Sequence, residues 1–502
     1  MMLVLRNAIL NGLGYATSLV VVFFLAPYMV SELGKTAYGI WVLLGSLVGY
    51  LGLLDLGVRG AVTRYVAKFH GQADHDKSSR TVSTAIGIFA IAGALAVMVA
   101  LILSAFADRI FQISPEFQPQ TRVIFLIGGA NVAISLVGGV FGGILAGLQR
   151  FDLLNTLDIA GVILRASAVV ISLHSGFGLI ALSAIELLLN VARGGASAWL
   201  SYRAYPGLRL GISYCDRSYF RLIFSFSFYL FAIHVSHQVI IYSDALVIGA
   251  FLPVSFVAFF AVAGNLITYS RELLSCITRV LTPLASSLDA KGDTAELRRV
   301  TQQYASFASM LIFPIVVTFA IRGTTFINLW MGREFGDLSG TVLRVLIPIT
   351  ALSAGNGVVC AVMLGIGKQK AIFPVFVGEA FCNVVLSCLL VKSYGVVGVA
   401  MGTLVPGLFT QCIFWPWYLN VSWGIPAYSH YMTTWIRPFL GVIPFMLLSY
   451  AFECLWLPPN VFAFFLQVAA TLPFAVLGFW FVCFSPSQRF ILCGKLWKSG
   501  CA

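Results

Sequence analysis

The chain has 502 residues, of which 59% are hydrophobic and only 10% are charged. No soluble core can hide so much apolar surface, so the composition excludes a water-soluble globular protein. The net charge of +12 would permit nucleic-acid binding, but the basic residues lie mostly in short segments between apolar stretches, which is typical of a membrane protein with no nucleic-acid partner.

Apolar stretches of about 20 residues, the length that crosses a bilayer, follow one another along the chain. We predict membrane spans over residues 8–31, 38–58, 81–106, 121–147, 156–174, 177–202, 222–251, 254–284, 303–328, 341–363, 371–391, 395–420, 434–455 and 461–484. The connections are too short to hold a separate soluble domain. The sequence therefore predicts an all-α polytopic membrane protein with about fourteen transmembrane helices.

Stretches one to six reappear as stretches seven to twelve. Residues 37–41 open the second stretch, and residues 256–260 open the eighth, 219 residues further on. Because each copy has an even number of spans, both copies share one orientation in the bilayer, as in transporters built from parallel repeats. The repeat predicts two like-oriented six-helix lobes and a C-terminal helical hairpin, over residues 1–203, 216–421 and 433–485.

Lys and Arg are distributed unequally between the two sides of the membrane. The segments on the side of the N-terminus carry twenty of them, the opposite segments carry seven, and four lie within spans. Cytoplasmic loops carry the excess of positive charge. We therefore expect both termini in the cytoplasm, and we attribute most of the basic surplus to topology and to contact with anionic membrane lipid.

Charged residues inside the spans are the candidate functional residues, because each costs about 2.5–3.5 kcal/mol in a bilayer and normally faces a wet cavity or a partner. The fifth stretch carries Asp158 and Arg165, and the sixth carries Glu186 and Arg193. Both pairs have i, i+7 spacing, which puts each pair on one helix face. The eighth stretch adds Arg271.

Guanidinium groups bind phosphate oxygens bidentately and stay charged at physiological pH. Arg165 and Arg193 from one lobe, with Arg271 from the other, are therefore our candidates for a cationic lumen that accepts an anionic head group. The alternative for Arg165 and Arg193 is that they only neutralise Asp158 and Glu186 between helices.

Three carboxyl groups within the spans are candidates for ion or proton coupling: Glu186, Asp244 in the seventh stretch and Glu379 in the eleventh. The alternative for each is a buried, protonated and hydrogen-bonded carboxyl group. His234 and His237 have i, i+3 spacing but no third ligand nearby, so we expect no metal site. We find no phosphate-binding loop and no catalytic constellation, so we expect neither a cofactor nor an enzyme.

Two further features are local. Asp55 lies at the inner end of the second stretch and is expected to anchor that end beside Arg59 or Arg64. Five glycines of the fourth stretch, spaced largely by four, predict either close helix packing or a surface that slides between conformations: Gly138, Gly139, Gly142, Gly143 and Gly147.

The opening of the chain resembles that of polysaccharide-unit flippases. The resemblance lies in Leu33-Gly34, Tyr38-Gly39-Ile40-Trp41, Leu53-Leu54-Asp55-Leu56-Gly57 and Arg64-Tyr65, and it continues in the Gly147-x-x-Arg150-Phe151-Asp152 turn and the Tyr205-Pro206 step. It covers about residues 1–420 and points to the Wzx-type O-antigen flippases of the multidrug/oligosaccharidyl-lipid/polysaccharide (MOP) exporter superfamily.

The resemblance implies a V-shaped pair of lobes with a cationic lumen, in the inner membrane of a bacterium. It also implies a polyprenyl-pyrophosphate-linked glycan as substrate, turned to the outer leaflet by alternating access for cell-surface polysaccharide synthesis. An ion gradient or the membrane potential would drive it, and polysaccharide polymerases and glycosyltransferases would be partners. The related peptidoglycan-precursor flippases have arginines within the first helix, whereas here Arg6 precedes it. The cationic role would therefore fall on Arg165, Arg193 and Arg271.

Three other functions remain open. An ion-coupled multidrug exporter of the same fold would bind cationic drugs and would need acidic residues in the first helix, where residues 8–31 have none. A sugar-unit polymerase or ligase would need a sizeable outer loop. A non-transporting scaffold would leave the intramembrane arginines as a cost without a use.

Overall fold

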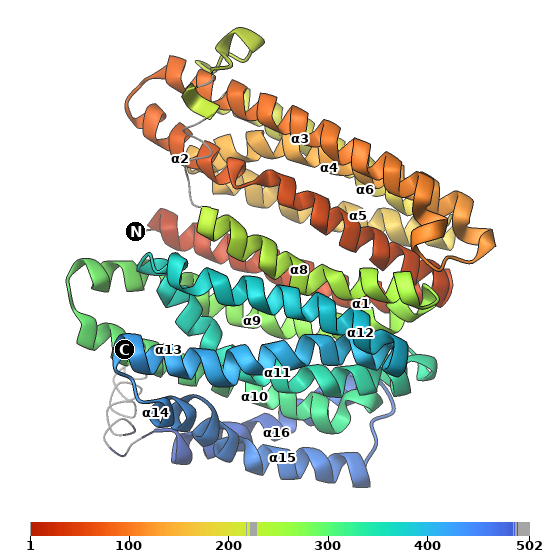
Figure 1. Ribbon diagram of the computed structural model, residues 1–502, viewed down its shortest axis with the longest axis vertical. Helices are drawn as coiled ribbons and strands as arrows, with labels where there is room; N and C mark the ends of the chain where they lie inside the picture. Colours follow the sequence, from red (N-terminus) through yellow and green to blue (C-terminus); the bar gives the residue numbers. More distant parts are fainter. Residues whose placement is uncertain (1, 217, 221–227, 485, 487–488, 490–502) are drawn as a thin grey trace. The chain divides into compact units, whose positions relative to one another are not determined.

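The computed structural model describes residues 2–216, 218–220, 228–484, 486 and 489, and their regular structure is almost entirely helical (Figure 1). The chain divides into two compact units, Met1–Ala258 and Phe259–Ala502. Among the described residues, eleven helical stretches are long and apolar enough to cross a membrane. The prediction of an all-α polytopic membrane protein is therefore confirmed.

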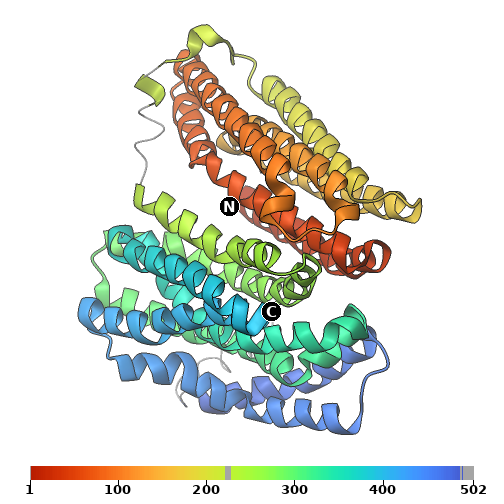
Figure 2. The same cartoon turned by 45° about the vertical axis from the view of Figure 1, so that its right-hand side comes forward.

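In the described part of the first unit there are seven helices and the start of an eighth. They are α1 (Met2–Leu51), α2 (Val58–Gly71), α3 (His75–Ile110), α4 (Gln118–Gly147), α5 (Phe151–His174), α6 (Leu179–Ala204), α8 (Phe228–Phe251) and α9 (Ser255–Ala290). Figure 2 shows α3 and α4, in two shades of orange, running side by side. Buried side chains of α2, α3 and α4 share one apolar core, to which Val62, Phe89 and Ile144 contribute.

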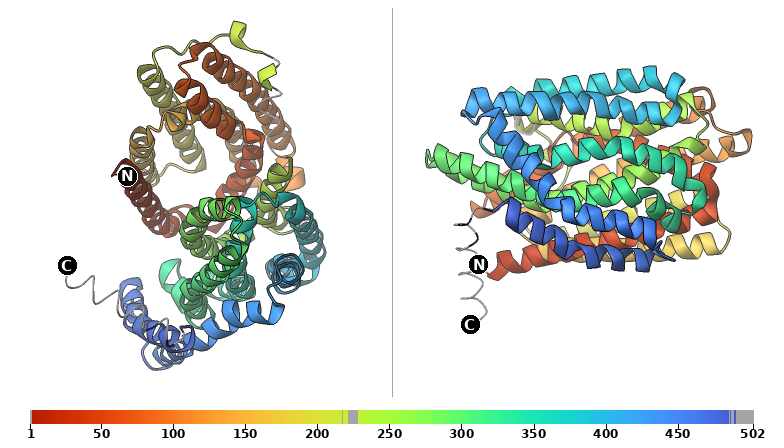
Figure 3. Two further views of the ribbon diagram at one scale, coloured as in Figure 1. Left: turned by 90° about the vertical axis from the view of Figure 1, so that its left-hand side faces the viewer. Right: turned by 90° about the horizontal axis from the view of Figure 1, so that it is seen from below.

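Up to Phe484, the second unit holds the rest of α9 and seven further helices. They are α10 (Thr294–Trp330), α11 (Arg333–Gly365), α12 (Gln369–Phe409), α13 (Trp415–Trp423), α14 (Ala427–Tyr431), α15 (Arg437–Leu455) and α16 (Val461–Val482). Two π-helical turns, Thr410–Phe414 and Met432–Ile436, join α12 to α13 and α14 to α15. Figure 3 shows α15 and α16, at the blue end of the chain, packed along one another.

Two helices each cover one predicted span and the start of the next, because α1 ends at Leu51 and α12 at Phe409, before the predicted ends at 58 and 420. The spans 8–31 and 38–58 meet within α1 at Gly34, where φ is 74°, and the spans 371–391 and 395–420 meet within α12 at Gly395, where φ is 59°. Glycine adopts positive φ without steric cost, so the backbone can kink there with no intervening loop. The span boundaries are therefore set by single glycines.

A short turn separates α1 from α2. A 3-10 turn covers Gly52–Asp55, and Leu56 and Gly57 follow with φ of 49° and 77°. The Asp55 carboxylate then accepts a hydrogen bond from the backbone N–H of Arg59 at 3.3 Å and forms an ion pair with its side chain. The prediction that Asp55 anchors this end beside Arg59 is confirmed.

The glycine face of α4 allows neighbouring helices to approach closely. A Cβ atom at Gly147 would lie 2.8 Å from the carbonyl oxygen of Thr63 on α2, and one at Gly138 would lie 3.1 Å from Gly194 on α6. A larger residue at either position would meet backbone, so α4 must keep small residues there. Close packing is thus what this stripe provides.

The segment that follows α6 returns along α3. The Tyr205 hydroxyl lies 3.0 Å from Nδ1 of His75, and the backbone N–H of Asp216 donates to the Thr84 hydroxyl at 3.2 Å. The backbone N–H and the hydroxyl of Ser218 both donate to the Asp216 carboxylate and hold its pKa below the ordinary value. Residues 205–216 are thereby tied to the first unit.

Helices α15 and α16 are joined to α10 by a buried polar network. Arg322 on α10 is only 1% exposed; its Nε lies 3.2 Å from the Glu453 carboxylate, and it also donates to the side chain of Gln467. Its guanidinium lies 4.7 Å from the centre of the Phe464 ring. Because α10 continues to Trp330, Arg322 lies inside the bundle.

Candidate functional site

The four charges predicted on the fifth and sixth stretches form two ion pairs between α5 and α6. Arg165 Nη2 lies 2.8 Å from Glu186 Oε2, and Arg193 contacts the Asp158 carboxylate. Residue numbers rise along α5 as those of their partners fall along α6, so the helices are antiparallel neighbours. The i, i+7 spacing separates the two pairs by about 10 Å along each helix axis.

Both pairs keep part of their polar surface accessible. The side chains of Arg165 and Arg193 are 47% and 51% exposed, whereas that of Glu186 is 18% exposed. A guanidinium has five N–H donors, and one contact to a carboxylate leaves several of them unused. The neutralising role considered for these arginines is therefore present, and it is compatible with a further ligand.

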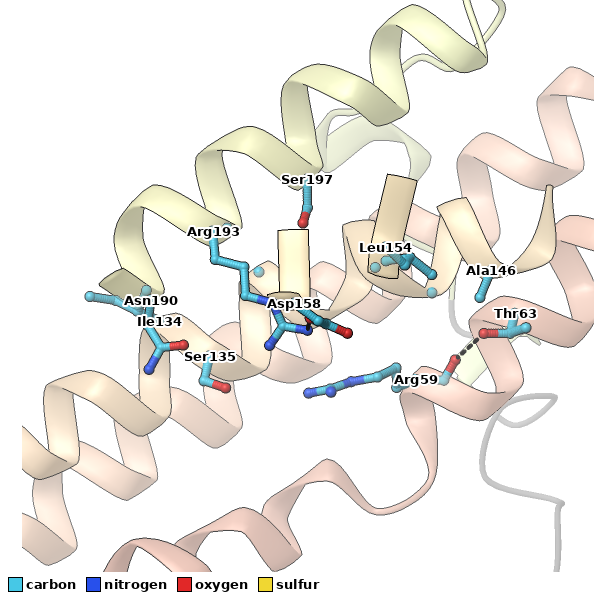
Figure 4. A pocket seen from close by; sticks show the side chains of 15 residues that line it. Arg59, Thr63, Ile134, Ser135, Ala146, Leu154, Asp158, Asn190, Arg193 and Ser197 are labelled. Carbon is cyan, nitrogen blue, oxygen red and sulfur yellow. Dashed lines mark hydrogen bonds and ion pairs between the residues drawn. The ribbon is translucent and has the colours of Figure 1, made fainter. Parts of the chain in front are cut away.

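The pair Arg193–Asp158 lines a pocket of about 230 Å³ among α2, α4, α5 and α6. We call it the Arg59 pocket. Figure 4 shows the side chains of Arg59 and Arg193 reaching toward the same space, with Asp158 beside Arg193. The lining also includes five glycines and several polar groups: Gly138, Gly139, Gly142, Gly143, Gly194, Thr63, Ser135, Asn190 and Ser197.

Arg59 depends on Gly139 for its position. A Cβ atom at Gly139 would lie 2.7 Å from Cζ of Arg59, within van der Waals overlap. From the sequence we predicted Arg59 only as a possible ion-pair partner of Asp55, and not as a residue that lines a pocket. The available signal was weak: Arg59 lies four residues after Asp55 at the inner end of a span, which also describes an ordinary interfacial ion pair.

The pair Arg165–Glu186 lines a second pocket, of about 190 Å³, among α1, α4, α5 and α6. We call it the Trp41 pocket. Besides Trp41 and the ion pair, its lining comprises Leu44, Gly45, Val48, Ile127, Gly128, Asn131 and Ser183. Asn190 of the Arg59 pocket donates to Oδ1 of Asn131 at 2.7 Å, so a hydrogen bond connects the linings of the two pockets.

The second unit brings together two more predicted residues. The Glu379 carboxylate on α12 is hydrogen-bonded to the side chain of Thr410, and Arg271 on α9 is close enough to interact with it electrostatically. Arg271 is half-buried. Each of the three predicted arginines thus lies near a carboxylate. That Arg271 faces Arg165 and Arg193 across a lumen stays a prediction.

Asp244 on α8 is 4% exposed, within the first unit. It neighbours Ser243, whose side chain is hydrogen-bonded to Tyr50 on α1. Within the described ranges, no group of three or more His, Cys, Asp or Glu side chains could hold a metal ion.

Comparisons with known proteins identify relatives. Residues 4–289 match the model of a family described as polysaccharide biosynthesis protein. The chain is 20% identical to the "Putative O-antigen transporter" of Shigella flexneri, over 80% of this chain and 94% of that protein. It is 24% identical to the "Probable flippase AglR" of Haloferax volcanii, over 75% of each. Both names describe transporters rather than enzymes.

Solved structures share the fold. The lipid II flippase MurJ in an inward closed conformation superimposes with a TM-score of 0.74 at 12% identity, covering 94% of this chain and 98% of that one. An inward-facing MATE family transporter of the MOP superfamily gives a TM-score of 0.70 at 15% identity, over 80% and 93%. The family match spans more than half of the chain, and the chain therefore belongs to the polysaccharide biosynthesis protein family, as a multi-pass membrane protein with the fold of the MOP transporters.

Proposed function

We propose that this protein is a flippase for a polyprenyl-pyrophosphate-linked oligosaccharide. It moves the lipid-linked unit from the cytoplasmic to the outer leaflet of a bacterial inner membrane, by alternating access, for cell-surface polysaccharide synthesis. The family match and the O-antigen transporter from Shigella flexneri, of which 94% is covered, support this substrate class. The observation that carries the proposal is the Arg59 pocket, where two guanidiniums from different helices share one cavity.

The finer architecture is part of the proposal. If α1 and α12 are each counted as two crossings at Gly34 and Gly395, and α9 is included, the chain crosses the membrane fourteen times. The crossings would form lobes over residues 1–203 and 216–421 and a hairpin over residues 433–485, with both termini in the cytoplasm. Polymerases and glycosyltransferases would act on the same lipid-linked glycan as partners.

The pocket chemistry suits a pyrophosphate. The charged residues of its lining are Arg59, Arg193 and Asp158, and the partner of Arg59, Asp55, lies outside the lining. Asp158 orients Arg193, whose remaining N–H groups can donate to phosphate oxygens in the charge-assisted, bidentate way that guanidiniums favour. Arg165 and Arg271 would meet the cargo at other stages of its passage.

Carboxylates beside the arginines can couple transport of the cargo to binding of a proton or another ion. Protonation of Glu186 or Glu379 would remove the negative charge next to Arg165 or Arg271 and release that arginine to the anionic cargo. Asp244, buried on α8, is the third candidate. Ion or proton binding at these groups would supply the drive.

The test separates a cargo-binding Arg193 from a merely neutralising one. The variants are Arg193→Gln, Asp158→Asn and the double variant, assayed by restoration of surface polysaccharide in a flippase-deficient strain, with membrane abundance measured by immunoblot. If Arg193 binds cargo, Arg193→Gln and the double variant are both inactive, and Asp158→Asn retains activity. Recovery of activity in the double variant would show that Arg193 serves only to balance Asp158.

Proteoliposomes separate the flippase from a multidrug exporter. The purified chain should translocate a fluorescent polyprenyl-pyrophosphate-linked glycan and should not transport a cationic dye. Dye transport without glycan translocation would reject the flippase function in favour of the exporter.

A further inference from the structure

We propose that the Trp41 pocket is a sugar-recognition subsite, which binds a single neutral sugar ring of the lipid-linked cargo. This inference rests on the proposed flippase function and adds to it the place where the glycan itself is recognised. The pocket has a volume of about 190 Å³ and is partly open, so a single sugar ring can enter it while the rest of the glycan extends outside.

The charge of the lining differs between the two pockets. The charged residues of the Trp41 pocket are Arg165 and Glu186, which neutralise one another. The lining of the Arg59 pocket carries two guanidiniums and one carboxylate, because the partner of Arg59, Asp55, lies outside the lining. An anion therefore gains more in the Arg59 pocket, whereas the Trp41 pocket suits a group that is polar and uncharged.

One polar side chain of the Trp41 pocket has no hydrogen-bond partner. The hydroxyl of Ser183 lies in a residue that is 2% exposed, and no atom of the described chain bonds to it. Leaving a buried hydroxyl unpaired costs about 1–3 kcal/mol, so such a group calls for an explanation. A ligand hydroxyl would supply both the donor and the acceptor that Ser183 lacks.

The rest of the lining can contact both the hydroxyl groups and the C–H face of a sugar ring. Asn131 accepts from Asn190 through its oxygen and keeps its NH₂ group as a donor. Glu186 holds Arg165 through Oε2 and keeps Oε1 as an acceptor. Trp41 supplies an aromatic surface for the C–H face of the ring, and pockets with an apolar wall and a few placed polar groups are typical ligand sites.

Gly45 leaves space open in the pocket, and a glycine within a helix lowers the stability of that helix. Gly45 lies inside α1, and a Cβ atom added there would meet nothing within 4 Å. Glycine inside a helix destabilises it by roughly 0.5–1 kcal/mol relative to alanine. An alanine would fit without collision, so packing of the chain does not require the glycine. Gly45 lines the pocket, and the space beside it stays open because it has no side chain.

The separation of the pockets suits one continuous ligand. Asp158 of the Arg59 pocket and Arg165 of the Trp41 pocket lie seven residues apart on α5, about 10 Å along the axis. A pyrophosphate held by Arg59 and Arg193 could therefore place the sugar attached to it beside Trp41.

The experiment measures binding of four lipids to the full chain in nanodiscs. One lipid is bare polyprenyl pyrophosphate, and the others carry a single glucose, galactose or N-acetylglucosamine. Two or three hydrogen bonds of about 0.5–1.5 kcal/mol each should make at least one sugar-bearing lipid about tenfold tighter than the bare lipid. Gly45→Leu, which fills the pocket, should abolish this preference and leave the affinity for the bare lipid unchanged.

Controls keep the test specific. Gly161, inside α5, also has no atom within 4 Å of an added Cβ but lines neither pocket, and Gly161→Leu should keep the sugar preference. Ser183→Ala removes one hydroxyl with little risk to folding and should reduce the preference severalfold. Equal affinity of the wild type for all four lipids, or an undiminished preference in both Gly45→Leu and Ser183→Ala, would overturn the subsite.

The same measurements separate the two proposals. If the wild type binds bare polyprenyl pyrophosphate but shows no sugar preference, the subsite is wrong and the flippase function stands. If it binds none of the four lipids, the flippase function itself fails.

Discussion

Arg322 should be among the side chains on which the second unit depends most. Arg322→Met keeps the length of the side chain and removes the guanidinium. The Glu453 carboxylate, whose side chain is 21% exposed, then loses its cation, and the Gln467 oxygen loses its donor. Removing one partner of a buried ion pair costs about 3–5 kcal/mol, because the other charge stays buried without compensation.

The assay is thermal unfolding of the purified protein in detergent, followed by size-exclusion chromatography of heated samples. In domains of 150–250 residues, 1 kcal/mol shifts the midpoint by about 2–4 °C, so Arg322→Met should lower it by roughly 6–20 °C. Arg344→Met is the matched control. Arg344 is exposed on α11 and donates a hydrogen bond to the Thr324 hydroxyl, and its loss should shift the midpoint by about 2 °C or less.

A double variant tests the physical reason. Arg322→Met combined with Glu453→Gln removes the uncompensated charge, so it should be more stable than Arg322→Met alone. The reasoning is refuted if Arg322→Met unfolds within 2 °C of Arg344→Met (about the margin expected of an exposed arginine), or if the double variant is the least stable of the set.

Two further predictions concern the first unit. Gly139→Ala places a Cβ against the guanidinium of Arg59, so it should displace Arg59 and reduce surface polysaccharide in the complementation assay while protein abundance stays normal. Gly142→Ala is the control and should be tolerated, because its Cβ would lie 3.8 Å from Leu154. Equal activity of both variants would remove Arg59 from the mechanism. Because hydrogen bonds from Ser218 lower the pKa of Asp216, the stabilisation is present above the ordinary carboxyl pKa and is lost as the pH falls through the lower, folded value. Hydrogen exchange around Asp216, corrected for intrinsic rates, should therefore quicken on acidification in the wild type and be fast at all pH values in Asp216→Asn; a pH-independent wild type would contradict this.

Features that arise within one stretch of chain could be predicted from the sequence. The membrane-crossing helices are one case, because a run of about 20 apolar residues is stable only when it leaves water. The pairing of Asp55 with Arg59 is another, since residues four apart in the chain stay close through the turn that leads into α2. The shared face of Asp158 and Arg165 follows in the same way from helical periodicity.

Contacts between helices could only be found in the folded molecule. Consecutive spans run antiparallel, which brings Asp158 to the level of Arg193, but only the packing of α5 on α6 shows that these faces meet and that Arg165 contacts Glu186. Arg59 enters a pocket because α2 meets the glycine face of α4, and Arg322 is buried because α15 and α16 cover it. Periodicity tells which face of a helix a residue occupies, but which helix that face meets depends on packing among segments far apart in the chain.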